Sequence, residues 1–138
     1  MKEILPGIFQ WSWFSQEKGL DFNGHLIVEK GERVIIDPPP MNPEDQIQIE
    51  RQRPIGSILI TNRDHIREAD VCRKIFRAKV LVPEGDAPEI PIQADGTYKN
   101  GESLPCRLKA IHIPDAKSAG ECAFLLSRDK GVLILGDA

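Results

Sequence analysis

The sequence predicts an α/β fold, and two patterns carry that prediction. Between residues 33 and 83, strand, helix and strand follow one another twice, an order that is typical of βαβ units with parallel strands. Outside that region, apolar runs joined by glycine-containing turns predict antiparallel hairpins. A single domain spanning residues 1–138 is the simplest organisation for a chain of this length.

The N-terminal third is predicted to be mainly β-structure. Residues 7–13 alternate apolar and polar side chains and are rich in aromatics, which favours a strand. The polar segment 15–24 is interrupted by glycines and predicts a loop. Two further strands, 25–29 and 33–37, are joined by a short turn as in a hairpin. Three prolines follow Asp37 and must end the second of them.

The middle of the chain supplies the two helices. A proline and acidic residues in the first turn predict a helix over residues 42–52. A short buried strand is expected over 57–61, and an amphipathic helix over 64–77. Residues 79–83 form another apolar strand. The segment 84–101 is rich in loop residues, although Ile90 and Ile92 are placed to pair with a sheet edge.

The C-terminal third is again predicted to be β-structure. Residues 106–113 alternate strictly, which predicts a half-exposed strand, and the apolar runs 122–126 and 132–135 form a hairpin. Very few residues follow that last apolar strand. We therefore expect the domain to be incomplete at its C-terminus, or a partner or second copy of the chain to cover this strand.

Composition narrows the classes of function. The net charge is −3 and the basic residues are scattered, so we expect no nucleic acid partner. No apolar run is long enough to span a membrane. Three cysteines without C-x-x-C spacing favour buried thiols in a reducing compartment. The predicted location is the cytoplasm.

Asp64 and His65 fall where a strand end meets a helix start, the place where α/β proteins usually bind ligands. A purely structural interpretation is also available. An aspartate at this position can cap a helix, and Thr61 and Asp64 have the spacing of a capping box. His25 and His112 lie within strands, which favours ordinary, partly buried histidines.

Four loop signals occur in a defined order after strands: Asp37-Pro38, Asn62-Arg63-Asp64-His65, residues 114–121, and Gly136-Asp137. This order resembles the metallo-β-lactamase superfamily. There, a strand ends in Asp, the next runs into T-H-x-H-x-D-H, a later one into P-G-H-T-x-G, and a further one ends in G-D. The resemblance covers residues 4–138. It implies a metallo-β-lactamase-like β-sandwich flanked by helices, incomplete at the C-terminus.

The same resemblance implies a degenerate metal site. In the family, the H-x-H and P-G-H histidines hold one metal, but here no histidine precedes Asp64 in its loop and residues 114–118 contain none. The family's second metal set retains Asp64, His65 and Asp137, a mixture that suits one zinc, iron or manganese ion. Asp64 is the predicted catalytic residue. The predicted supporting residues around that set are Asp37, Asn62 and Ser118.

Two functions follow from this resemblance. In the first, one metal ion at Asp64, His65 and Asp137 activates water against a small ester, thioester, amide or phosphoester substrate. In the second, the chain holds no metal, has lost catalysis and acts as a binding module for a small molecule or a protein partner. Asp64 is then only a helix cap, and Asp137 only ends a strand.

Overall fold

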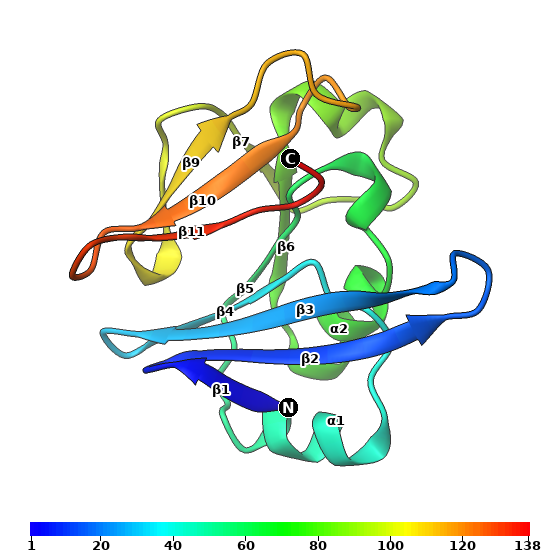
Figure 1. Cartoon of the computed structure of the whole chain (residues 1–138), viewed down its shortest axis with the longest axis vertical. Coiled ribbons are helices and arrows are strands. Elements are labelled where there is room, and N and C mark those ends of the chain that lie inside the picture. The colour runs from blue at the N-terminus through cyan, green and yellow to red at the C-terminus, as the bar shows by residue number, and fades with distance from the viewer.

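Two β-sheets and two short α-helices make up the computed structural model, which describes residues 1–138 (Figure 1). The larger sheet contains, in spatial order, β1 (Lys2–Leu5), β2 (Ile8–Ser15), β3 (Leu20–Glu29), β4 (Glu32–Ile36), β5 (Ser57–Leu59), β6 (Lys79–Pro83) and β7 (Gly96–Tyr98). The smaller sheet contains β11 (Val132–Ile134), β10 (Cys122–Leu126), β9 (Leu108–His112) and β8 (Ser103–Leu104).

The predicted βαβ units are present in the larger sheet. Strands β4, β5 and β6 are parallel neighbours, with β7 parallel at the edge, whereas β1 to β4 are antiparallel. Helix α1 (Pro43–Glu50) lies between β4 and β5 in the chain, and α2 (Ala69–Phe76) lies between β5 and β6. The carboxyl ends of the parallel strands therefore share one edge of the sheet, where β4 leads into Asp37 and β5 into the loop with His65.

The second predicted helix starts later than expected. Residues Arg63–His65 form a separate 3₁₀ turn, η1, and α2 begins only at Ala69. Between them, Arg67 adopts a left-handed backbone conformation with φ of 42°, which no continuous helix accommodates. The apolar periodicity of residues 66–76 is real, because Ile66, Ala69 and Cys72 are all buried. Periodicity alone does not reveal a break in the backbone.

Other predicted boundaries also change. Strand β3 begins at Leu20, so much of the predicted loop 15–24 belongs to the β2–β3 hairpin. This extension is polar because it projects beyond the core. Strand β5 ends at Leu59 rather than at residue 61. In the segment 84–101, β7 pairs with the sheet edge in place of Ile90 and Ile92. Strand β9 begins at Leu108, since residues 106 and 107 have positive φ values.

Two apolar cores separate three layers of structure. Alternate residues of β4 face opposite ways: Val34 and Ile36 point toward the smaller sheet, and Ile35 points toward the helices. The first core fills the space between the sheets and includes Phe124, while the second fills the space between the larger sheet and the helices and includes Phe76. All three cysteines are buried and free, as the sequence predicts.

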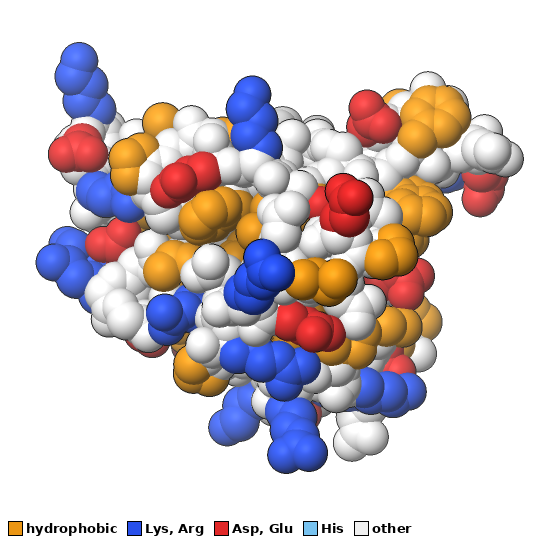
Figure 2. Space-filling model, turned by 90° about the horizontal axis from the view of Figure 1, so that it is seen from below, with side chains coloured by type: hydrophobic (Ala, Val, Ile, Leu, Met, Phe, Trp, Pro, Cys, Tyr) orange, Lys and Arg blue, Asp and Glu red, His pale blue; other side chains and the backbone are white.

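Charged side chains of both signs occur on the face of the molecule that is seen from below (Figure 2). Lys and Arg side chains gather toward the lower and left margins of this view, and apolar side chains lie among the acidic ones. Neither α-helix is long enough or apolar enough to cross a membrane.

Candidate functional site

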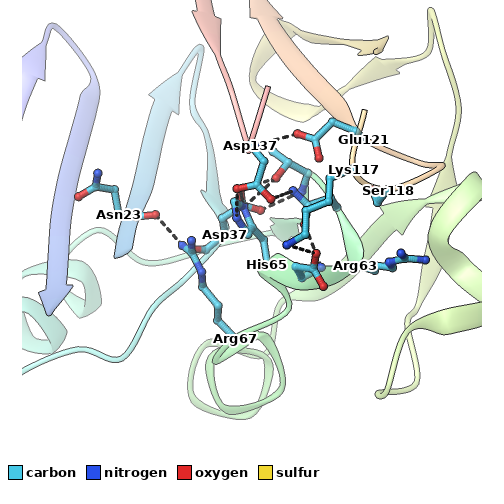
Figure 3. A network of polar contacts seen from close by, with 12 residues as sticks. Asn23, Asp37, Arg63, His65, Arg67, Lys117, Ser118, Glu121 and Asp137 are labelled. Atoms are coloured by element: carbon cyan, nitrogen blue, oxygen red, sulfur yellow. Dashed lines mark hydrogen bonds and ion pairs between the residues drawn. The ribbon is translucent and has the colours of Figure 1, made fainter. Parts of the chain in front are cut away.

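Polar side chains from four separate segments meet at the edge of the larger sheet (Figure 3). Asp37 follows β4, His65 closes the 3₁₀ turn after β5, Lys117 precedes β10, and Asp137 follows β11. They line an open cleft of about 450 Å³, in which only three of the fourteen lining residues are hydrophobic. Such a volume is in the range of small-molecule sites.

His65 lies between two carboxylates. Its Nδ1 is 2.9 Å from Oδ2 of Asp37, and its Nε2 is 3.1 Å from Oδ1 of Asp137. Asp37 is buried, and its two oxygens also accept hydrogen bonds from the backbone N–H and the hydroxyl of Thr61, at 2.8 and 2.6 Å. The backbone of Asp37 has a φ of 48°. Positive φ values are uncommon for residues other than glycine, and those that occur are concentrated at functional sites. A doubly protonated imidazole donates to both carboxylates at once.

Electrostatics favour that doubly protonated ring. Burial is the largest single influence on the pKa of His65 and lowers it, but the hydrogen bond to Asp37 and the negative charges of Asp37 and Asp137 together outweigh it. The net result is a pKa above the ordinary value of 6.5. The neighbouring His25, on β3, behaves in the opposite way: burial lowers its pKa, against the attraction of Asp37.

Asp64 makes a different set of contacts from those the sequence predicts for a helix cap. Asn62 is the cap of the 3₁₀ turn, and its side-chain oxygen accepts a hydrogen bond from the backbone N–H of Asp64 at 2.9 Å. The capping role assigned to Asp64 is therefore wrong. Its carboxylate instead lies 3.0 Å from Nζ of Lys117, and that hydrogen bond lowers the pKa of Asp64.

A buried carboxylate, Asp86, ties the two site loops together. Its Oδ2 accepts hydrogen bonds from the backbone N–H of Arg63 at 2.8 Å and from the hydroxyl of Ser118 at 2.7 Å. Its Oδ1 accepts one from the backbone N–H of Gly120 at 2.8 Å. Ser118, predicted as a supporting residue of the site, thus contacts Asp86 rather than His65 or Asp137. Its effect on the site is to hold the Lys117 loop in place.

Arg67 connects the β2–β3 hairpin to the site. Its guanidinium lies over the ring of Phe22, 4.6 Å from the centroid, and donates hydrogen bonds to the backbone carbonyls of Asn23 and Asp37 at 2.9 and 3.0 Å. Burial lowers the pKa of this guanidinium, while the negative charges of Asp37 and Asp137 oppose that effect. An arginine stays protonated in proteins, so Arg67 contributes a fixed positive charge to the cleft wall.

Glu121 and Gly136 position Asp137. Oε1 of buried Glu121 accepts a hydrogen bond from the backbone N–H of Asp137 at 2.9 Å, and burial raises the pKa of this glutamate. Gly136 passes so close to the β5 loop that a Cβ atom there would lie 2.5 Å from the hydroxyl oxygen of Thr61 and 2.6 Å from Oε1 of Glu121. Only glycine allows this approach.

Comparison with known proteins identifies the family. The family model described as "Metallo-beta-lactamase superfamily" matches residues 1–138, and the chain therefore belongs to this superfamily. No curated protein matches the sequence. Members of the superfamily typically bind zinc. The predicted fold class is confirmed.

Solved structures show the same fold at low sequence identity. The metallo-β-lactamase GOB-18 from Elizabethkingia meningoseptica has a TM-score of 0.64 and 20% identity, over 81% of this chain and 54% of that one. A metallo-β-lactamase from Hirschia baltica has a TM-score of 0.68 and 13% identity, over 91% of this chain and 65% of that one. A metallo-β-lactamase family protein from Thermus thermophilus has a TM-score of 0.66 and 17% identity, over 90% of this chain and 57% of that one. The chain spans between about half and two thirds of these proteins.

The side chains at the site do not fit the metal ion that the family implies. A histidine binds a metal ion through the unprotonated nitrogen of a neutral imidazole, whereas the two carboxylates that face His65 raise its pKa and favour the doubly protonated ring. Asp64, the third predicted ligand, contacts Lys117. No three His, Cys, Asp or Glu side chains lie together in a way that could hold a metal ion. The ligand set Asp64, His65 and Asp137 stays a prediction, as does the catalytic role of Asp64.

The sequence motifs contain several of the residues that meet at the site but do not mark all of them. The structure places Asp37, His65 and Asp137 in contact and Asn62 at their border, where its amide nitrogen lies 3.5 Å from Oδ2 of Asp137. The overlooked residues are Arg67, Asp86, Lys117 and Glu121. Lys117 and Glu121 fall in a loop that the motif comparison already covers, so a cation in place of the expected histidine was a usable signal. No pattern in the sequence marks Asp86, which lies in an irregular segment.

Proposed function

We propose that this chain is a binding domain that takes a small polar molecule in the cleft around His65 and does not carry out metal-dependent hydrolysis. One observation carries the proposal: Asp37 and Asp137 occupy both nitrogens of His65, at 2.9 and 3.1 Å. In its doubly protonated form, which the raised pKa favours, a histidine held in this way has no free lone pair for a metal ion or for a substrate proton.

The cleft itself supports a small-molecule ligand. Its volume of about 450 Å³ and its polar lining are compatible with a compact molecule that carries charges or hydrogen-bonding groups. Charged side chains of both signs line the cleft: Arg67 and Lys117 are basic, and Asp64 and Asp137 are acidic. A ligand with both an acidic and a basic group would be complementary to such a wall.

A second candidate is the hydrolase with a single metal ion that the sequence suggests. The observation in its favour is that Nε2 of His65 and Oδ1 of Asp137 lie 3.1 Å apart and both belong to residues of the cleft wall. Membership of a superfamily that typically binds zinc also supports it. The two candidates make opposite predictions about the metal content of the protein.

Elemental analysis of the purified protein, prepared without chelators, separates the candidates. The Asp137→Ala variant serves as the comparison. We expect no stoichiometric zinc, iron or manganese in either protein, including after each has been soaked in these ions and desalted. About one equivalent in the natural sequence, lost in Asp137→Ala, would overturn the binding-domain proposal. It would also justify a screen of ester, thioester, amide and phosphoester substrates.

A further inference from the structure

The carboxyl groups of the site require positive charge nearby. Asp37, Asp64 and Asp137 all line the cleft, and Glu121 lies directly behind Asp137. Like charges this close repel one another, most strongly at buried Asp37 and less at Asp64 and Asp137, whose side chains are 43% and 39% exposed, and nearby cations relieve that repulsion. A bound metal ion is one means of supplying that charge, and basic side chains of the protein are another.

Three basic side chains stand among these carboxylates. His65 lies between Asp37 and Asp137, and Arg67 is attracted by the same two residues. The third is Lys117, whose Nζ is 3.0 Å from Oδ2 of Asp64 and which is also attracted by Asp137. The close-up view shows the Lys117 side chain extending from its loop toward the group that contains His65 and Asp137 (Figure 3).

We propose that the ammonium group of Lys117 takes the place of a metal cation at this site and excludes divalent ions from it. The inference rests on the proposed function, because it explains how the site exists without a metal. A divalent ion would have to displace the ammonium from Asp64 and would meet its repulsion beside Asp137. Lys117 comes from the loop in which the superfamily motif has a metal-binding histidine, and it delivers charge to the same carboxylates.

The position of Lys117 makes this role separable from folding. Its side chain is 71% exposed, and the backbone of its loop is held independently by Asp86 through Ser118 and Gly120. Truncation of Lys117 therefore removes the charge but leaves the loop anchored. Since an exposed ion pair contributes little to stability, the variant should fold normally.

The test is a titration with Mn²⁺ of the natural sequence and of Lys117→Ala. Thermal unfolding reports the affinity, and paramagnetic broadening of backbone amide signals reports the location. We expect Mn²⁺ to bind Lys117→Ala roughly tenfold more tightly than the natural sequence, because one neighbouring positive charge has been removed. The broadening should be strongest at residues 64, 65 and 137 and should fade with distance from them. Lys117→Arg keeps the charge, and Lys130→Ala removes an exposed lysine in the β10–β11 turn; both should behave as the natural sequence does.

Each outcome has a distinct meaning. Tighter binding by Lys117→Ala alone supports the inference. Equal, weak binding by all four proteins overturns it and leaves the binding-domain proposal standing. Tighter binding that also appears in Lys130→Ala overturns it as well, because loss of any surface charge would then suffice. Stoichiometric metal in the natural sequence overturns the inference and the proposed function together.

Discussion

At the scale of single residues, His65 is the group whose charge defines the site. Its two carboxylate partners are distant from it in the sequence: Asp37 lies 28 residues before it and Asp137 lies 72 residues after it. The folded state therefore creates an environment that the unfolded chain lacks. Any difference in proton affinity between the two states must appear in the stability of the protein.

The stability contributed by His65 should depend on pH with a definite sign. Because folding raises the pKa of His65, the folded state binds the proton more tightly than the unfolded state, whose pKa is near 6.5. The contribution is fully present below pH 6.5 and is lost as the pH rises through the folded pKa. Burial of His25 lowers its pKa and has the opposite slope, so the natural sequence alone does not isolate the effect.

Urea unfolding of the natural sequence and of His65→Gln at a series of pH values isolates the contribution of His65 to the free energy of unfolding. The difference in free energy of unfolding between the two proteins should shrink as the pH rises from 6 to 9, by about 1.4 kcal/mol for each unit by which the pKa is raised. His112→Gln provides a matched control on β9. A difference that stays constant with pH, or one that grows, would show that His65 is not preferentially protonated in the folded state.

At the scale of elements, the site depends on irregular segments that regular structure holds in place. The sequence predicts the strands well because their apolar periodicity directly reflects burial in the two cores. It does not predict the 3₁₀ turn that carries His65 or the left-handed residue Arg67, because both segments contact residues that are distant in the sequence: the backbone N–H of Arg63 bonds to Asp86, and the Arg67 guanidinium bonds to the carbonyls of Asn23 and Asp37. Nor does it predict the attachment of two loops to Asp86, which lies 23 and 34 residues away from its backbone partners.

Removal of the Asp86 carboxylate should loosen both site loops. Asp86→Ala leaves the N–H groups of Arg63 and Gly120 and the hydroxyl of Ser118 without their acceptor in a buried setting. Three hydrogen bonds to a charged group are lost, and since each contributes about 1.5–3 kcal/mol, we expect a loss of at least about 4.5 kcal/mol in the free energy of unfolding. Chemical denaturation measures it. Ser118→Ala removes only one of the three bonds and should cost about 1.5 kcal/mol; equal losses in the two variants would contradict the loop-anchoring role.

At the scale of the whole molecule, one sheet serves two cores. Its inner face packs against the smaller sheet and its outer face against α1 and α2. The site lies where the strands of both sheets end, so the packing between the sheets determines how the loop of β5 faces the end of β11. The order of the motifs along the chain predicted this convergence correctly, because the fold fixes which strand ends meet.

Phe124 tests the packing between the sheets. It is fully buried on β10, and its ring lies 5.6 Å from that of Tyr98 on β7. Phe124→Ala should lower the free energy of unfolding by about 3–5 kcal/mol, through lost burial and the cavity that remains. Phe14, 57% exposed on the β2–β3 hairpin, offers a control of the same chemistry. If Phe14→Ala proved equally costly under urea denaturation, the core would not lie where the structure places it.

The close approach at Gly136 has an electrostatic consequence. Because the chain passes against Thr61 and Glu121 without a side chain, Asp137 reaches Nε2 of His65. A larger residue at position 136 would force the end of β11 outward and carry the second carboxylate away from the imidazole. The protonation of His65 therefore depends on a residue that has neither charge nor side chain, and that does not touch the ring.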